Sequence, residues 1–156
     1  MNSSYEKETE RLRYLILAAQ RQGNRMLNQF LSSSGLTSST AEVIRVLEEH
    51  EPISLKELGS LLICETGSPS RLIKGLINEG IVEQVANPKD SRSKLLRLTK
   101  IGKSKMKFIK DTEQKFYEQF FEVFTMDELK NTNLLLSGLI KEISDTEALK
   151  KRGLVE

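Results

Sequence analysis

Residues 54–102, SLKELGSLLICETGSPSRLIKGLINEGIVEQVANPKDSRSKLLRLTKIG, decide the fold. The stretch opens with apolar residues at helical spacing, which are Leu55, Leu58, Leu61 and Leu62. After a break at residues 65–69, a second helical face follows, made of Leu72, Ile73, Leu76 and Ile77. Gly80 stands just beyond it, where a left-handed C-cap favours glycine. Two short helices separated by so brief a break predict a helix-turn-helix.

The start of the second helix lies between Thr66 and Pro69. Proline has no N–H group to donate and is tolerated only in the first turn of a helix. With Ser68 as the N-cap, Pro69 is the first helical residue, and with Thr66 as the N-cap it is the third. Both alternatives turn the end from Thr66 to Arg71 outward, and a recognition helix contacts bases mainly with its N-terminal end.

The other face of this helix is polar and cationic, which suits a DNA major groove lined with acceptors and phosphates. We expect its DNA contacts to come from Thr66, Ser68, Ser70, Arg71 and Lys74.

After Gly80 the period changes to that of strands, over residues 81–86 and 94–99. The segment between them, NPKDSRS, is rich in turn formers. The pattern predicts a β-hairpin whose tip carries Lys89, Arg92 and Lys94, with Asp90 placed to brace Arg92. A helix-turn-helix followed by such a hairpin is a winged helix, in which the hairpin is the wing.

Helical patterns also flank this core. They predict a helix over residues 8–32 with a possible bend at Gly23, a second over 38–50, a third over 103–124 and a last one from 126 to about 148. Residues 1–7 are polar and are expected to be frayed. Pro52 stops the second helix, and Ile53 is expected to add a minimal strand beside the wing. The fold class is therefore mostly α with a small β-hairpin wing (α+β).

These residues resemble the MarR family of bacterial transcription regulators. The resemblance rests on Leu36-Thr37, Gly80-Ile81-Val82, the wing pattern Asp90-x-Arg92, and Leu98-Thr99-x-x-Gly102. It covers nearly the whole chain, and it implies a single domain over residues 1–156, with a DNA-binding core at 36–100. It further implies dimerisation helices at 8–33 and 103–148, and a small-molecule crevice between them and the winged helix. The terminal helices themselves carry more apolar surface than one winged helix can cover, which favours a homodimer.

Charge is distributed unevenly along the chain. The net charge is only +2, yet residues 54–107 hold 11 Lys and Arg against 5 Asp and Glu. This surplus coincides with the predicted DNA-binding stretch. One cysteine allows no internal disulfide, the N-terminus is too charged for a secretory signal, and no stretch approaches the ~18 apolar residues of a membrane span. We expect a cytoplasmic protein without membrane contact.

Three further features have plain structural interpretations. His50 is expected at a helix end, and one His with one Cys cannot build a usual zinc site, so no metal or other cofactor is expected. Cys64 is expected to be a small packing residue, with thiol-based oxidant sensing as the alternative. The aromatic residues between Phe116 and Phe124 are expected in a core or interface, with a ligand pocket as the alternative.

The sequence thus predicts a homodimeric regulator that binds double-stranded DNA at an inverted repeat, acts as a repressor, and is released by a small-molecule effector of unknown identity. It is not expected to be an enzyme, because the chain has no Gly-rich phosphate loop and no nucleophile elbow. The alternatives are a winged helix that binds protein without DNA, a transcription activator, and a redox sensor that uses Cys64.

Overall fold

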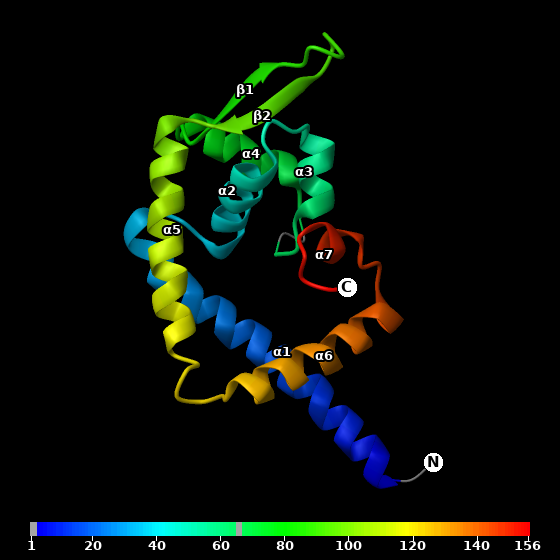
Figure 1. The fold of residues 1–156 in the computed structure, drawn as a ribbon. Helices are drawn as coiled ribbons and strands as arrows, with labels where there is room; N and C mark the ends of the chain where they lie inside the picture. Colours follow the sequence, from blue (N-terminus) through cyan, green and yellow to red (C-terminus); the bar gives the residue numbers. More distant parts are fainter. Residues whose placement is uncertain (1–2, 65–66) are drawn as a thin grey trace.

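The computed structural model describes residues 3–64 and 67–156 and contains helices and a single two-stranded hairpin within them. In chain order the elements are α1 (Ser3–Leu31), the 3-10 helix η1 (Ser32–Ser34), α2 (Ser38–His50), α3 (Leu55–Leu61), α4 (Pro69–Asn78), β1 (Val82–Ala86), β2 (Lys94–Leu98), α5 (Lys100–Glu118), α6 (Met126–Ile143) and α7 (Glu147–Lys151). The hairpin and α3–α4 lie at one end of the molecule, and α1 and α6 cross at the other (Figure 1). The predicted fold class, mostly α with a hairpin wing, is confirmed.

The buried core belongs almost entirely to one continuous stretch of the chain. It extends from Leu31 to Ile109 and is centred on α2, where Val43, Ile44 and Leu47 have no exposed surface. Leu58 of α3 and Leu76 of α4 pack into the same cluster. The winged-helix lobe, defined here as residues 36–102, therefore carries most of the hydrophobic core.

Side-chain caps fix the starts of α2, α3, α5 and α6. Thr37 and Thr40 form a reciprocal capping box at α2, and Ser54 and Glu57 form another at α3. Such boxes satisfy the first N–H groups of a helix, which have no partner within it. The predicted starts of these two helices follow from this local chemistry.

The Leu98-Thr99-x-x-Gly102 motif joins the wing to α4 and α5. The Thr99 hydroxyl accepts from the backbone N–H of Gly102 and lies 2.6 Å from the carbonyl oxygen of Gly80, to which it donates. The backbone N–H of Thr99 donates to the carbonyl of Ile81 at 3.1 Å. Gly80 has a φ of 71°, a conformation that suits glycine. The motif is thus a structural junction between the recognition helix and the wing.

The predicted boundaries of three helices are wrong. Helix α1 starts at Ser3, and residues 3–7 are helical because no breaker precedes Glu8 and the Thr9 hydroxyl donates to the carbonyl of Tyr5. Helix α5 starts at Lys100, since Thr99 caps it, and ends at Glu118 in a run of tight turns through Phe124. The last predicted helix is divided in two at Ser144, whose extended backbone ends α6.

Other local expectations are confirmed. His50 lies in the last turn of α2 as expected, whereas Gly23 does not interrupt α1. Ile53 pairs with Leu96 as an isolated bridge beside the wing.

The helices outside the lobe expose apolar surface. Leu31 is the only residue of α1 that is buried, and no residue of α6 is. Leu134 and Leu135 of α6 are 72% and 75% exposed. Phe30, Phe116, Phe120 and Phe124 form a row of ring contacts with centroid distances of 5.4–6.4 Å. Large exposed apolar faces of this kind mark interaction surfaces.

Candidate nucleic-acid interface

The recognition helix α4 begins with Ser68 as its N-cap and Pro69 as its first helical residue. Its structure therefore selects the first of the two alternatives for the start. The backbone N–H groups of Arg71 and Leu72 both donate to the carbonyl of Ser68, so the first turn is closed without an N–H from proline. Thr66, which we expected among the DNA contacts, lies outside the described residues.

The polar side of α4 is open to solvent. Ser68, Ser70, Arg71 and Lys74 are all exposed, while Ile73 and Leu76 of the same helix are buried. The hydroxyl oxygens of Ser68 and Ser70 lie 2.6 Å apart. Four of the five predicted α4 residues are thus brought together on one accessible surface.

A groove of about 470 Å³ runs along this helix beside the start of α2. Arg71 lines it together with Ser68, Thr40 and Glu79. Arg71 of α4 and Thr40 from the capped N-terminal turn of α2 thus line the same groove, and a cation beside a helix N-terminus suits a phosphate backbone.

The wing is an antiparallel hairpin in which Val82 pairs with Leu98 and Ala86 with Lys94. Its tip is held by side-chain hydrogen bonds: the amide of Asn87 donates to the hydroxyl of Ser93 at 2.8 Å, and its oxygen accepts from the backbone N–H of Lys89. Lys89, Arg92 and Lys94 are exposed there. The hairpin thus presents a cationic tip.

Asp90 holds the wing tip in a way that the sequence did not reveal. Its Oδ1 accepts from the backbone N–H of Arg92 at 2.9 Å. We expected a brace on the Arg92 side chain, and this is corrected to a contact on its backbone. An acidic residue two positions before an amide favours this local turn, so Asp90 shapes the tip instead of orienting the guanidinium.

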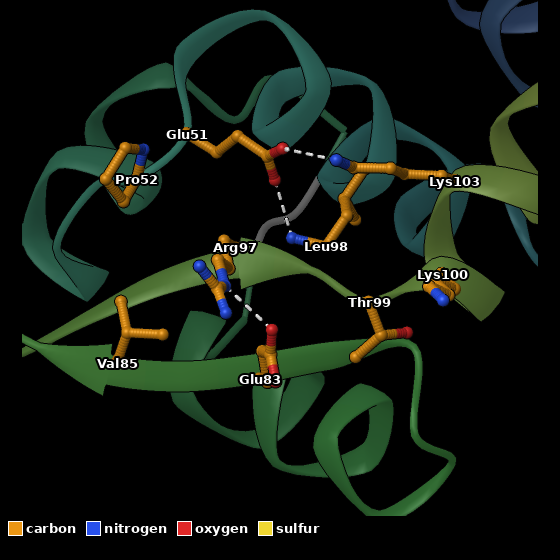
Figure 2. Close-up of a pocket in the computed structure, with 9 residues that line it drawn as sticks. All are labelled: Glu51, Pro52, Glu83, Val85, Arg97, Leu98, Thr99, Lys100 and Lys103. Carbon is orange, nitrogen blue, oxygen red and sulfur yellow. Dashed lines mark hydrogen bonds and ion pairs between the residues drawn. The ribbon is translucent and has the colours of Figure 1, made fainter.

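Behind the wing, a pocket of about 480 Å³ connects it to α2 and α5 (Figure 2). On one side of it Glu51 accepts from the backbone N–H of Leu98 at 2.6 Å and pairs with Lys103 at 3.8 Å. On the sheet, Arg97 pairs with Glu83 at 2.7 Å, and both side chains are about half exposed. Sequence reasoning missed both the Glu51 contacts and the Arg97–Glu83 pair. Only the Arg97–Glu83 pair had a signal in the sequence, namely opposite charges at paired strand positions.

Cys64 is exposed, so the expectation that it fills the core is wrong. The turn that follows α3 keeps it at the surface, where its backbone N–H donates to Glu42. Neighbouring atoms partly desolvate the thiol, and this effect together with the Glu42 carboxylate raises the pKa of Cys64 to about 11. At neutral pH the thiol is therefore protonated, and a protonated thiol is a poor target for peroxide.

Two other observations bear on function. No group of three His, Cys, Asp or Glu side chains in the described part of the chain is placed to hold a metal ion. Among residues 3–64 and 67–156, no helix has the length and apolar content to cross a membrane.

Comparison with known proteins relates this geometry to a family. Residues 36–102 match the family of winged helix DNA-binding domains. The Escherichia coli multiple antibiotic resistance protein MarR is 26% identical over 127 residues, which cover 81% of this chain and 88% of MarR. A mutant of that protein, crystallised with operator DNA, has the same fold, with a TM-score of 0.77 over 85% of this chain and 96% of that one. The chain is thus similar to MarR in both sequence and fold.

Two other bacterial regulators extend the likeness. The transcriptional regulator SarZ of Staphylococcus haemolyticus is 26% identical over 129 residues, covering 83% of this chain and 85% of SarZ. A MarR-like regulator from Bacillus cereus, at 22% identity, has the same fold with a TM-score of 0.79, over 88% of this chain and 99% of that one. The chain is accordingly a transcription regulator with a DNA-binding winged helix, and its relatives are regulators and not enzymes.

Proposed function

We propose that this regulator is a repressor that binds an inverted-repeat operator as a homodimer and is released by a small-molecule effector. The observation that carries the proposal is the pair of exposed cationic surfaces on one lobe, the α4 face and the wing tip. We place Ser68, Ser70, Arg71 and Lys74 at the major groove and its nearby phosphates. Arg92 enters the minor groove, with Lys89 and Lys94 on the backbone and Asp90 shaping the tip.

The proposed dimer uses the helices outside the lobe. In this division residues 36–100 bind DNA, and the segments 8–33 and 103–148 dimerise. The exposed apolar faces of α1 and α6 support it, because isolated monomers rarely leave such faces uncovered. A two-fold dimer would place its two recognition helices about one DNA turn, ~34 Å, apart, which matches an inverted repeat.

The effector is proposed to bind between the lobe and the dimerisation helices. The aromatic row supports this placement, since Phe30 of α1 contacts Phe116 of α5 near the end of the lobe. Repression would follow from occupancy of a promoter, and binding to chromosomal DNA places the regulator in the cytoplasm.

The roles of wing and helix can be separated by two alanine variants. The probes are a duplex that the wild-type protein selects from a random-sequence pool and a scrambled duplex of equal length. Arg92→Ala should weaken binding to both duplexes similarly and lower the salt slope by about one phosphate equivalent. Arg71→Ala should cost roughly 1–3 kcal/mol on the selected duplex and less on the scrambled one, because a guanidinium can hydrogen-bond guanine bidentately.

Titration of both variants at several salt concentrations provides the comparison. Loss confined to the selected duplex in Arg92→Ala, together with equal loss in Arg71→Ala, would reverse the two assignments. If wild-type binding to every duplex were weak and independent of salt, the winged helix would instead be a protein-binding module. A reporter gene behind the selected site then distinguishes repression from activation.

A further inference from the structure

Glu42 of α2 is a buried carboxylate that holds the start of the connection between α3 and α4. The residue is only 7% exposed. Its Oε1 accepts from the backbone N–H of Ile63 at 2.9 Å, and its Oε2 accepts from that of Cys64 at 2.7 Å. Both amides follow Leu62, the C-cap of α3. The carboxylate thus fixes the backbone that leads from α3 toward the recognition helix.

The charge of Glu42 is balanced from the far end of the sequence. Nη1 of Arg152 lies 2.5 Å from Oε1 of Glu42, the oxygen that also accepts from Ile63. The two residues are 110 positions apart, and their side chains are 12% and 6% exposed. Such a pair is sensitive to the loss of one member, because the remaining charge is left buried without compensation.

Arg152 is held in place by the way in which α7 ends. Gly153 has a φ of 66°, and the backbone N–H of Leu154 donates to the carbonyl of Leu149 at 2.8 Å. This is the hydrogen-bond pattern of a Schellman C-cap, which fixes the last turn of a helix. Helix α7 also packs against α3, so the C-terminal segment contacts the helix-turn-helix at more than one point.

Between the lobe and Arg152 the chain leads away from the lobe and then returns to it. After β2, α5 leaves the lobe, α6 crosses beneath it, and α7 returns to α3 (Figure 1). Helix α6 buries none of its own residues, so it is attached to the lobe through α5 at one end and α7 at the other. A partner that covers α6 is therefore linked, through α7 and the Arg152–Glu42 pair, to the connection that precedes the recognition helix.

We propose that Glu42 and Arg152 are positioning residues for DNA binding, which tie the C-terminal segment to the connection that sets the position of α4. The inference rests on the proposed function in that α6 belongs to the dimer interface. The position of the recognition helix then depends on where α6 is held, although neither charged side chain touches DNA.

The test compares three full-length variants. Arg152→Ala removes the cation and Arg152→Lys retains it. Lys151→Ala is the matched control, since Lys151 is the exposed last residue of α7 and directly precedes Arg152. Binding to the duplex selected by the wild-type protein is measured at several salt concentrations. Amide hydrogen exchange of Ile63 and Cys64 is followed by NMR without DNA.

Arg152→Ala should lower affinity for the selected duplex about tenfold or more and speed exchange at both amides, because the buried carboxylate is left without a counter-charge and no longer holds them. The salt slope should stay at its wild-type value, since no phosphate contact is lost. Arg152→Lys should restore most of the affinity, and Lys151→Ala should match the wild type.

Unchanged affinity and exchange in Arg152→Ala would overturn the proposal, as would a salt slope lowered by about one, which indicates direct phosphate contact. Should Arg152→Ala fail to fold, Glu42→Gln serves instead: it removes the charge with little change of shape, and wild-type exchange and affinity in it would refute the coupling. If the wild type selected no duplex, the proposed function would fail, while exchange at the two amides would still decide whether Arg152 controls the connection.

Discussion

Replacing Gly102 with alanine should destabilise the junction between wing, recognition helix and α5. A β-carbon at this position would lie 2.3 Å from the carbonyl oxygen of Ile81 and 3.1–3.2 Å from side-chain carbons of Leu98. The carbonyl belongs to the backbone and accepts from the N–H of Thr99, so it cannot move without disturbing that bond.

The size of the effect follows from three contributions. Overpacking of a well-filled site costs about 1–3 kcal/mol, and a backbone obstacle favours the upper end. Losing a hydrogen bond at Ile81 adds about 1 kcal/mol. Alanine recovers up to about 1 kcal/mol in helix propensity. We therefore expect a net loss of about 3 kcal/mol, or roughly 6–12 °C in Tm for a chain of this length.

Thermal unfolding by circular dichroism measures this loss, at one protein concentration because a dimer unfolds in a concentration-dependent way. Gly75→Ala in α4 is the matched control, since nothing lies within 4 Å of its added β-carbon. The control should be slightly stabilised. A Gly102→Ala protein as stable as the Gly75→Ala protein would refute the packing argument.

Three further outcomes are expected. Cys64, with a pKa of about 11, should react with iodoacetamide slowly at pH 7 and faster as the pH approaches that value. Fast alkylation at neutral pH would contradict the raised pKa, and Cys64→Ser should bind DNA normally. Hydrogen bonds from Ser54 lower the pKa of Glu57, so its contribution to stability is present above pH 4.5 and is lost as pH falls through its folded pKa; Glu57→Gln, which keeps the cap, should show a smaller loss in acid urea titrations. If α6 forms the proposed dimer interface, Leu135→Glu should abolish dimers in sedimentation experiments. Ile101→Glu, at an exposed position where α5 begins within the lobe, should leave them intact.

Short-range sequence patterns were enough to predict much of the winged-helix lobe. The apolar repeat before Gly80 predicts α4, and the alternation of Leu96 and Leu98 predicts β2, because both elements bury one face against the same core. The wing tip and the exposed polar face of α4 follow from the same periodicities. Four of the five predicted α4 contacts lie together for this reason.

Local sequence patterns could not predict features that depend on contacts between distant parts of the chain. Nothing near Glu42 in sequence indicates a partner at Arg152, and the exposure of Cys64 follows from the position of the turn after α3. The start of α5 was missed for a different reason, since Thr99 is a capping residue that also ends a strand. The break between α6 and α7 at Ser144 was also missed, because no glycine or proline marks it in the sequence.

The order of the elements along the chain has a consequence during synthesis. The buried core draws on residues from Leu31 to Ile109, so the lobe has nearly all of its core once α5 has left the ribosome. Helix α1 is made before that and α6 after it, and their apolar faces find no cover within the lobe. A nascent chain therefore carries a finished lobe beside an uncovered leucine-rich helix, and exposed apolar surface of this kind favours aggregation.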